Sequence, residues 1–123
     1  MEPNSKKILI IEDEKPLARA LELKLIHEGF FVKNIPSGEG LMPLLESEKF
    51  SLIVCDLIMP KVDGFQVLKM IKDKDLKIPV IILSNLGQPE DEKHAIELGA
   101  SSFFIKSDTP LSKITDYIKE ILV

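Results

Sequence analysis

Short apolar runs alternate with helix-like segments along the whole chain, and this alternation most constrains the fold. Three runs are rich in β-branched residues and are typical of strands buried on both faces: Ile8–Ile11, Leu52–Cys55 and Pro79–Leu83. Two weaker runs, Phe31–Ile35 and Ser102–Ile105, complete a set of five. The pattern predicts an α/β fold with a parallel sheet and right-handed crossovers. The simplest arrangement is a doubly wound, flavodoxin-like sheet in the order 2-1-3-4-5 with five helices.

The segments between these runs carry helix signals. Pro16 suits the first turn of the first helix, and Gly29 suits a left-handed cap at its end. Asp63 stands at an N-cap position before the third helix. The second helix is expected to be short, or to begin near Leu41, because Pro43 fits only a first turn. The last helix carries an apolar stripe that is expected to join the core rather than form a partner groove: Leu111, Ile114, Ile118, Ile121 and Leu122.

The composition fits one domain held together by packing. The 123 residues, 45% of them hydrophobic and 29% charged, are enough for an ordinary core. A net charge of −4 disfavours nucleic acid and anionic membranes, so we expect no direct binding to either. The longest apolar stretch, Ile78–Leu83, is far shorter than the ~20 residues of a membrane helix, and the start of the chain does not read as a signal peptide. A cytoplasmic location is the resulting expectation.

The single cysteine and the two histidines predict no chemistry. Cys55 has no disulfide partner, and with only His27 and His94 it makes no structural zinc site. We expect Cys55 to be a small buried hydrophobic residue, and both histidines to lie at the surface or at helix ends.

Polar residues, in contrast, stand at the ends of four predicted strands. Glu12 and Asp13 follow the first strand, Asp56 the third, Ser84 the fourth and Lys106 the fifth. In a doubly wound sheet the carboxyl ends of the strands meet at one edge, where ligands bind. Singly, each residue is also explained as a solvated loop residue or a turn former. Together they predict a pocket with three carboxylates, a hydroxyl and an ammonium group.

This set of groups suits phosphoryl transfer to a carboxylate. Clustered carboxylates repel one another unless a cation neutralises them, and all-oxygen ligands select Mg²⁺, or Mn²⁺ in its place, over zinc. A carboxylate beside that metal acts as nucleophile, while Lys106 and Ser84 stabilise the phosphoryl oxygens. The expected product is an aspartyl phosphate.

Four segments, in this order and spacing, resemble the receiver domains of two-component response regulators. They are Ile10–Glu14, Asp56–Gly64, Val80–Ser84 and Gly99–Lys106. The resemblance covers essentially the whole chain, so residues 1–123 are expected to form a single receiver domain with no output domain visible. It implies a histidine kinase or a histidine phosphotransfer protein as partner, and no separate substrate turnover.

The resemblance also implies a role for each site residue. Asp56 would accept phosphate from a phosphohistidine, and Lys106 would pair with the phosphoryl oxygens. Glu12, Asp13, Asp56 and the backbone carbonyl of Ile58 would hold Mg²⁺. Ser84 and Phe103 would act as a switch that reshapes the face made by the fourth helix, the fifth strand and the fifth helix. Phe103 is equally explained as plain core, because it lacks the hydroxyl of the more usual tyrosine.

Several positions depart from the family pattern. Ser107 follows Lys106 where a proline in a cis peptide is usual, so a trans path or a strained loop is expected. Asn85 replaces a small residue and narrows access to the phosphate. Ile58 and Leu86, at positions that tune dephosphorylation in the family, are apolar and cannot orient a water molecule. We therefore predict a fairly long-lived phosphoryl group.

The same residues bear on three other functions. A pseudo-receiver that acts only as an interaction module is favoured by a missing acceptor, acid or lysine, and none is missing. An aspartate-dependent phosphatase needs a second acid where Lys15 stands, and no glycine-rich phosphate loop follows the first strand. The downstream effector, phosphorylation-dependent homodimerisation, and the choice between a stand-alone regulator and a piece of a longer protein stay open.

Overall fold

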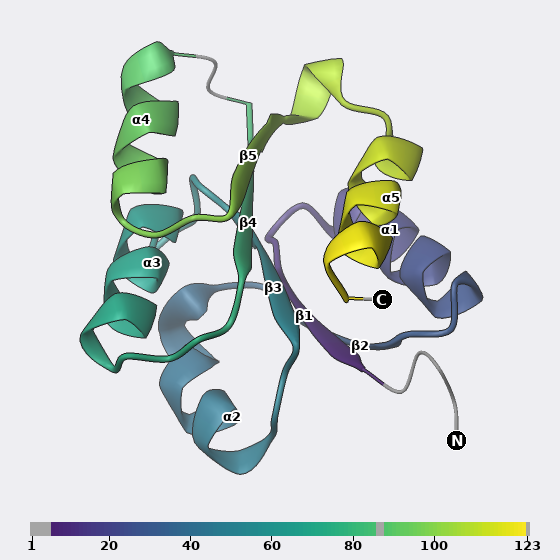
Figure 1. Ribbon diagram of the computed structural model, residues 1–123, viewed down its shortest axis with the longest axis horizontal. Coiled ribbons are helices and arrows are strands. Elements are labelled where there is room, and N and C mark those ends of the chain that lie inside the picture. Colours follow the sequence, from purple (N-terminus) through teal and green to yellow (C-terminus); the bar gives the residue numbers. More distant parts are fainter. Residues whose placement is uncertain (1–5, 86–87, 123) are drawn as a thin grey trace.

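The computed structural model describes residues 6–85 and 88–122. A parallel five-stranded sheet in the order β2-β1-β3-β4-β5 lies between two helical layers (Figure 1), which confirms the predicted topology. The strands are β1 (Lys7–Ile11), β2 (Phe31–Ile35), β3 (Leu52–Asp56), β4 (Val80–Ser84) and β5 (Ser102–Ile105). The α-helices are α1 (Lys15–His27), α2 (Leu41–Ser47), α3 (Gly64–Asp73), α4 (Pro89–Glu97) and α5 (Leu111–Leu122).

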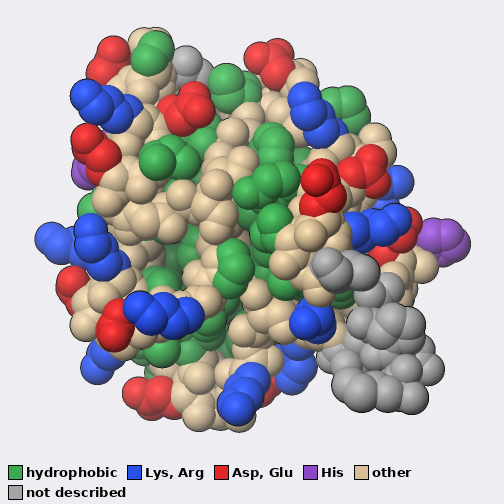
Figure 2. Space-filling model, viewed as in Figure 1, with side chains coloured by type: hydrophobic (Ala, Val, Ile, Leu, Met, Phe, Trp, Pro, Cys, Tyr) green, Lys and Arg blue, Asp and Glu red, His purple; other side chains and the backbone are tan. Residues whose placement is uncertain are grey.

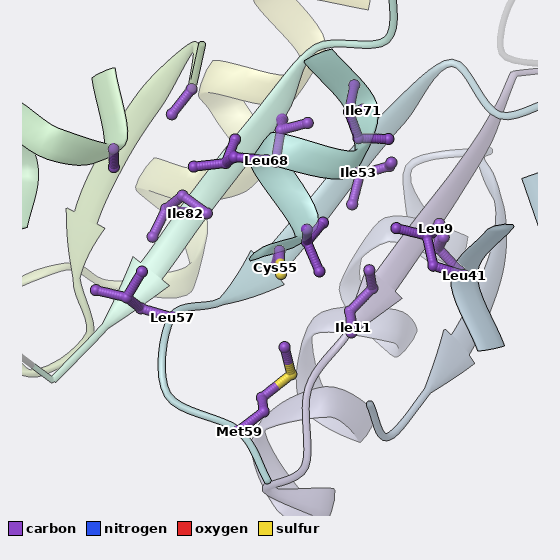
Figure 3. Close-up of a cluster of buried hydrophobic side chains, with 14 of the residues drawn as sticks. Leu9, Ile11, Leu41, Ile53, Cys55, Leu57, Met59, Leu68, Ile71 and Ile82 are labelled. Carbon is purple, nitrogen blue, oxygen red and sulfur yellow. The ribbon is translucent and has the colours of Figure 1, made fainter. Parts of the chain in front are cut away.

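Each face of the sheet has its own hydrophobic core. In β1, Leu9 and Ile11 point to the core under α2, α3 and α4, whereas Ile8 and Ile10 point to the core under α1 and α5. Figure 3 shows the first of these cores, in which Cys55 is fully buried, as predicted. Because helices cover both faces, the central strands are continuous apolar runs rather than alternating ones.

Helix ends follow the local signals in the sequence. Gly29 and Gly99, just beyond α1 and α4, have φ angles of +100° and +109°, which favour glycine. Helix α2 begins at Leu41 after a 3₁₀ turn, so Pro43 lies in its first turn, as predicted. Every helix in the described part of the chain is too short or too polar to cross a membrane.

Three details differ from the prediction. Strand β3 extends by one residue, to Asp56. Strand β4 begins and ends one residue later than expected, so Ser84 is the last residue of the strand and not the first residue after it. In α5, Ile118 is buried but Ile121 is 39% exposed. Leu122, four residues after Ile118, turns toward the core, and this geometry directs Ile121 to solvent.

Candidate functional site

The carboxyl edge of the sheet brings together residues that are far apart in the sequence. One carboxylate oxygen from each of Glu12, Asp13 and Asp56 lies within 4.8 Å of the others. Glu12 and Asp56 are buried, whereas Asp13 is exposed. The strand order explains this meeting, because β1 and β3 are direct neighbours and end at the same level. The structure therefore places the three predicted metal ligands side by side.

Lys106 extends from the end of β5 into this acidic group. Its Nζ donates hydrogen bonds to Asp56 Oδ2 at 3.1 Å, to Glu12 Oε2 at 3.3 Å and to Glu14 Oε2. Only 9% of the lysine side chain is exposed. Burial alone lowers the pKa of Lys106, but the bonds to Glu14, Glu12 and Asp56 outweigh it and raise the pKa above the usual range. The ammonium group is therefore charged at every physiological pH.

Glu12 is the most perturbed carboxyl group of the site. Burial raises its pKa to about 7, against a hydrogen bond from the Glu14 backbone N–H and the one from Lys106, both of which lower it. Its Oε1 lies 3.0 Å from Lys106 Nζ but outside hydrogen-bond geometry, and has no hydrogen-bond partner among the described residues. A buried carboxylate oxygen that accepts no hydrogen bond, next to two further carboxylates, fits a hard divalent cation such as Mg²⁺.

A pocket of about 360 Å³ opens beside these groups. It is lined by Asp13, Glu14, Asp56, Ile58, Asn85 and Lys106. Its walls combine a cation and three carboxylates with one apolar side chain, that of Ile58, which is 57% exposed. The volume accommodates a phosphoryl group together with a hydrated metal ion. Asn85 lines the opening, as expected from its position after β4.

Of the two predicted switch residues, Ser84 lies at this edge of the sheet, whereas Phe103 pairs with Ile82 near the start of β5. Neither residue lines the pocket. Ser84, the last residue of β4, is fully buried. Phe103 of β5 is half-buried and packs against the core under α2, α3 and α4. The Lys106–Ser107 peptide is trans, since the described residues contain no cis bond, and Lys106–Asp108 form a 3₁₀ turn. The trans path is thus the one that the chain takes.

The loop after β3 holds Asp56 through its backbone. Asp63 caps α3: its Oδ1 accepts from the Gln66 N–H at 2.9 Å, and Gln66 Oε1 accepts from the Asp63 N–H at 2.9 Å. Gly64, the first residue of α3, packs so closely that an added Cβ would lie 2.7 Å from the Asp56 carbonyl oxygen and 2.8 Å from Leu57 Cα. The start of α3 thereby fixes the position of the Asp56 backbone.

Replacing Gly64 with alanine is expected to destabilise the fold by about 1 to 3 kcal/mol, because the contacts that would clash are backbone atoms. Chemical denaturation measures the free energy of unfolding. Gly40→Ala is the matched control, since an added Cβ there meets nothing within 4 Å. Equal stability of the two variants would contradict this description of the loop.

Two contacts in the structure are not predicted by the sequence. Glu14 occupies the N-cap of α1 but makes no side-chain cap; its side chain reaches Lys106 instead. The His94 ring on α4 is exposed, as expected, but stacks on Phe65 of α3 with ring centroids 4.5 Å apart. The only sequence signal for the first contact is an acid directly after Glu12 and Asp13, and none exists for the second. Leu86 lies outside the described residues.

Comparison with known proteins assigns the class that this fold and site define. Residues 8–119 match the model of the response regulator receiver domain. The chain belongs to this family, and it is therefore part of two-component signalling.

Individual relatives agree with this assignment. The "Probable transcriptional regulator ycf27" of Cyanophora paradoxa is 37% identical over 89% of this chain and 46% of its own length. The "Alkaline phosphatase synthesis transcriptional regulatory protein PhoP" of Bacillus subtilis is 32% identical over 96% of this chain and 49% of its own length. The chain thus spans about half the length of these relatives. The signal receiver domain of a histidine kinase from Syntrophus aciditrophicus superposes with a TM-score of 0.86, at 30% identity, over 96% of this chain and 90% of that one.

Proposed function

We propose that Asp56 accepts a phosphoryl group from a phosphohistidine in a magnesium-dependent reaction. A carboxylate oxygen of Asp56 forms the new bond to phosphorus while the phosphorus–nitrogen bond of the donor breaks, and the imidazole leaves with the electron pair and takes up a proton. The observation that carries the proposal is the Lys106 ammonium group 3.1 Å from Asp56 Oδ2, inside a pocket that also contains Asp13. The positive charge offsets the charge that builds up on the phosphoryl oxygens.

The geometry favours Asp56 over the other two acids as nucleophile. Glu12 is buried and does not line the pocket, so a donor cannot reach it. Asp13 lines the pocket, but the ion pairs of Lys106 among the described residues are with Asp56, Glu12 and Glu14. Among the three clustered acids, Asp56 alone combines access to the pocket with direct contact to the Lys106 ammonium group.

Glu12 and Asp13 act in this proposal as ligands that complete a Mg²⁺ site with Asp56 and the backbone carbonyl of Ile58. The orphaned Oε1 of Glu12 supports this role. When bound, Mg²⁺ supplies positive charge that neutralises the carboxylates and the equatorial phosphoryl oxygens. Manganese, with the same preference for oxygen ligands, substitutes for it.

Phosphoramidate tests the proposal against the pseudo-receiver alternative, because its phosphorus–nitrogen bond mimics that of phosphohistidine. With Mg²⁺ present, intact mass measurement is expected to show one phosphoryl group added. A chain that remains unmodified, under conditions that modify other receivers, would establish the pseudo-receiver that only docks to partners.

Output follows, in this proposal, from movement of Ser84 and Phe103. The buried Ser84 hydroxyl does not face the pocket, so it donates to a phosphoryl oxygen only after the end of β4 shifts. This shift lets half-buried Phe103 repack and alters the face of α4, β5 and α5, where apolar side chains gather over β5 (Figure 2). That face is the proposed contact for an effector or for a second phosphorylated copy.

The partners that we propose are a histidine kinase or a histidine phosphotransfer protein as donor. Residues 1–123 are proposed to act as one receiver unit, without substrate turnover beyond their own phosphorylation and dephosphorylation. The absence of direct nucleic acid binding and the cytoplasmic location stay predictions from charge and composition. The relatives named transcriptional regulators are about twice as long as the matched segment. Their names therefore do not test the prediction that this chain does not bind nucleic acid directly.

The phosphoryl group is expected to persist for minutes or longer, because the exposed Ile58 side chain at the pocket mouth cannot orient an attacking water. Ile58→Asn adds a hydrogen-bonding group there and is expected to hasten hydrolysis about tenfold, equivalent to 1.4 kcal/mol. Mass measurement at intervals after removal of the donor gives both rates. Ile26→Asn, at a position on α1 that is also about half exposed, serves as the control. Loss from the parent within seconds would contradict the prediction.

A further inference from the structure

All three N–H donors of the Lys106 ammonium group are engaged in hydrogen bonds. An ammonium carries three N–H bonds, and the three acceptors are Glu12 Oε2, Asp56 Oδ2 and Glu14 Oε2. Two of these acceptors belong to the cluster that fits a metal ion. Glu14 does not belong to it, and comes from the N-cap of α1. While Asp56 is still a carboxylate, a phosphoryl oxygen of the incoming donor can therefore accept from Lys106 only if one of these three carboxylates leaves.

Burial decides which carboxylate leaves. The exposed fractions of the side chains are 3% for Glu12, 5% for Asp56 and 51% for Glu14. A buried carboxylate that loses its bond to Lys106 has little access to water to replace that bond, which is unfavourable. An exposed carboxylate that leaves a salt bridge is rehydrated at little cost. Exchange at Glu14 is the least costly way to free a donor.

We propose that Glu14 is an exchangeable counter-charge of Lys106, a positioning residue that holds the ammonium group in the unphosphorylated chain and gives way to the phosphoryl oxygen. This inference rests on the proposed phosphoacceptor function and adds a control on its rate. Glu14 also lines the pocket mouth with Ile58 and Asn85, so that its negative charge faces any anion that enters. Glu14 therefore slows entry of anionic donors and occupies the place that the phosphoryl group takes.

Glu14→Gln separates the charge of Glu14 from its shape. The amide has the same length and keeps a carbonyl oxygen that accepts from Lys106, so the lysine stays in the pocket. The variant lacks the charge that repels the donor and the charge-assisted bond that must break. At saturating Mg²⁺, its phosphorylation by acetyl phosphate, a dianion, is expected to be about three to ten times faster than that of the parent.

Two further readouts distinguish this role from a merely structural one. The rate increase is expected to shrink as salt rises toward 1 M, where the screening length falls to about 3 Å. Beryllofluoride, an anionic mimic of the phosphoryl group, is expected to bind Glu14→Gln more tightly than the parent, as followed by NMR titration. This binding measurement does not depend on turnover. Glu46→Gln on α2 is the matched control, since it removes an equal charge from an exposed residue outside the pocket.

The outcomes are distinct. A faster Glu14→Gln, with Glu46→Gln like the parent, supports the inference. If the parent is phosphorylated but Glu14→Gln is equal or slower, or if both variants are equally faster, the inference is overturned while the proposed function stands. If the parent takes up no phosphoryl group, the proposed function fails and the role of Glu14 fails with it.

Discussion

Asp56→Asn is expected to take up no phosphoryl group from phosphoramidate or acetyl phosphate, with or without Mg²⁺. The amide nitrogen that replaces one carboxylate oxygen is not a nucleophile, and the remaining amide oxygen carries no negative charge. We expect neither of the other two clustered acids to take over, because Glu12 is buried outside the pocket and Asp13 is not among the described ion-pair partners of Lys106. Intact mass measurement after incubation with the donor reports the result directly.

The variant should remain folded, so that loss of modification is not loss of structure. Asparagine has the shape of aspartate, and removing one charge relieves repulsion among three carboxylates that lie within 4.8 Å. A midpoint of thermal unfolding no lower than that of the parent checks this. Asp116→Asn, an exposed position on α5, is the matched control and should be phosphorylated like the parent. Modification of folded Asp56→Asn would refute the assignment of the acceptor.

Mg²⁺ is expected to stabilise the parent chain by about 1.4 kcal/mol when its concentration is ten times the dissociation constant. For a domain of this size the midpoint of thermal unfolding rises by about 5 °C. The reason is that the folded chain gathers Glu12, Asp13 and Asp56 at one edge, which the unfolded chain does not. Removal of the ion with a chelator should abolish both the stabilisation and the reaction with phosphoramidate.

Asp13→Asn tests whether the stabilisation comes from the proposed site. This exposed side chain contributes little to the core, so the variant folds, but the loss of a charged ligand should remove most of the Mg²⁺-induced shift. Asp73→Asn, an exposed residue at the end of α3, should keep the full shift. NaCl at equal ionic strength controls for general screening of acids. An undiminished shift in Asp13→Asn would place the ion elsewhere.

The sequence was sufficient for the parts of the fold and site that depend on topology. Buried β-branched runs at Ile8 and Ile53 indicated strands covered on both sides, and the strand order then placed their carboxyl ends at one edge. Once that edge was defined, Glu12, Asp56 and Lys106 had to meet, although Lys106 is 94 residues from Glu12. The start of α2 was also predictable, because Pro43 fits only the first turn of a helix.

Contacts that depend on side-chain conformation were not predictable. Glutamate is not a preferred N-cap residue, and nothing in the sequence directs the Glu14 side chain toward Lys106. The stack of His94 on Phe65 joins α3 and α4, whose relative placement is set by the packing of both helices on the sheet. The exposure of Ile121 depends on which neighbour of Ile118 turns inward. Each of these is decided by tertiary packing rather than by local propensity.

Reductive trapping of the acyl phosphate tests the central claim most directly. The parent chain is incubated with phosphoramidate and Mg²⁺, treated with borohydride, which reduces an aspartyl phosphate to homoserine, and mapped by peptide mass spectrometry. We predict homoserine at position 56 alone, and none when a chelator is present. Homoserine at position 13, an unmodified Asp56, or equal modification without Mg²⁺ would contradict the account.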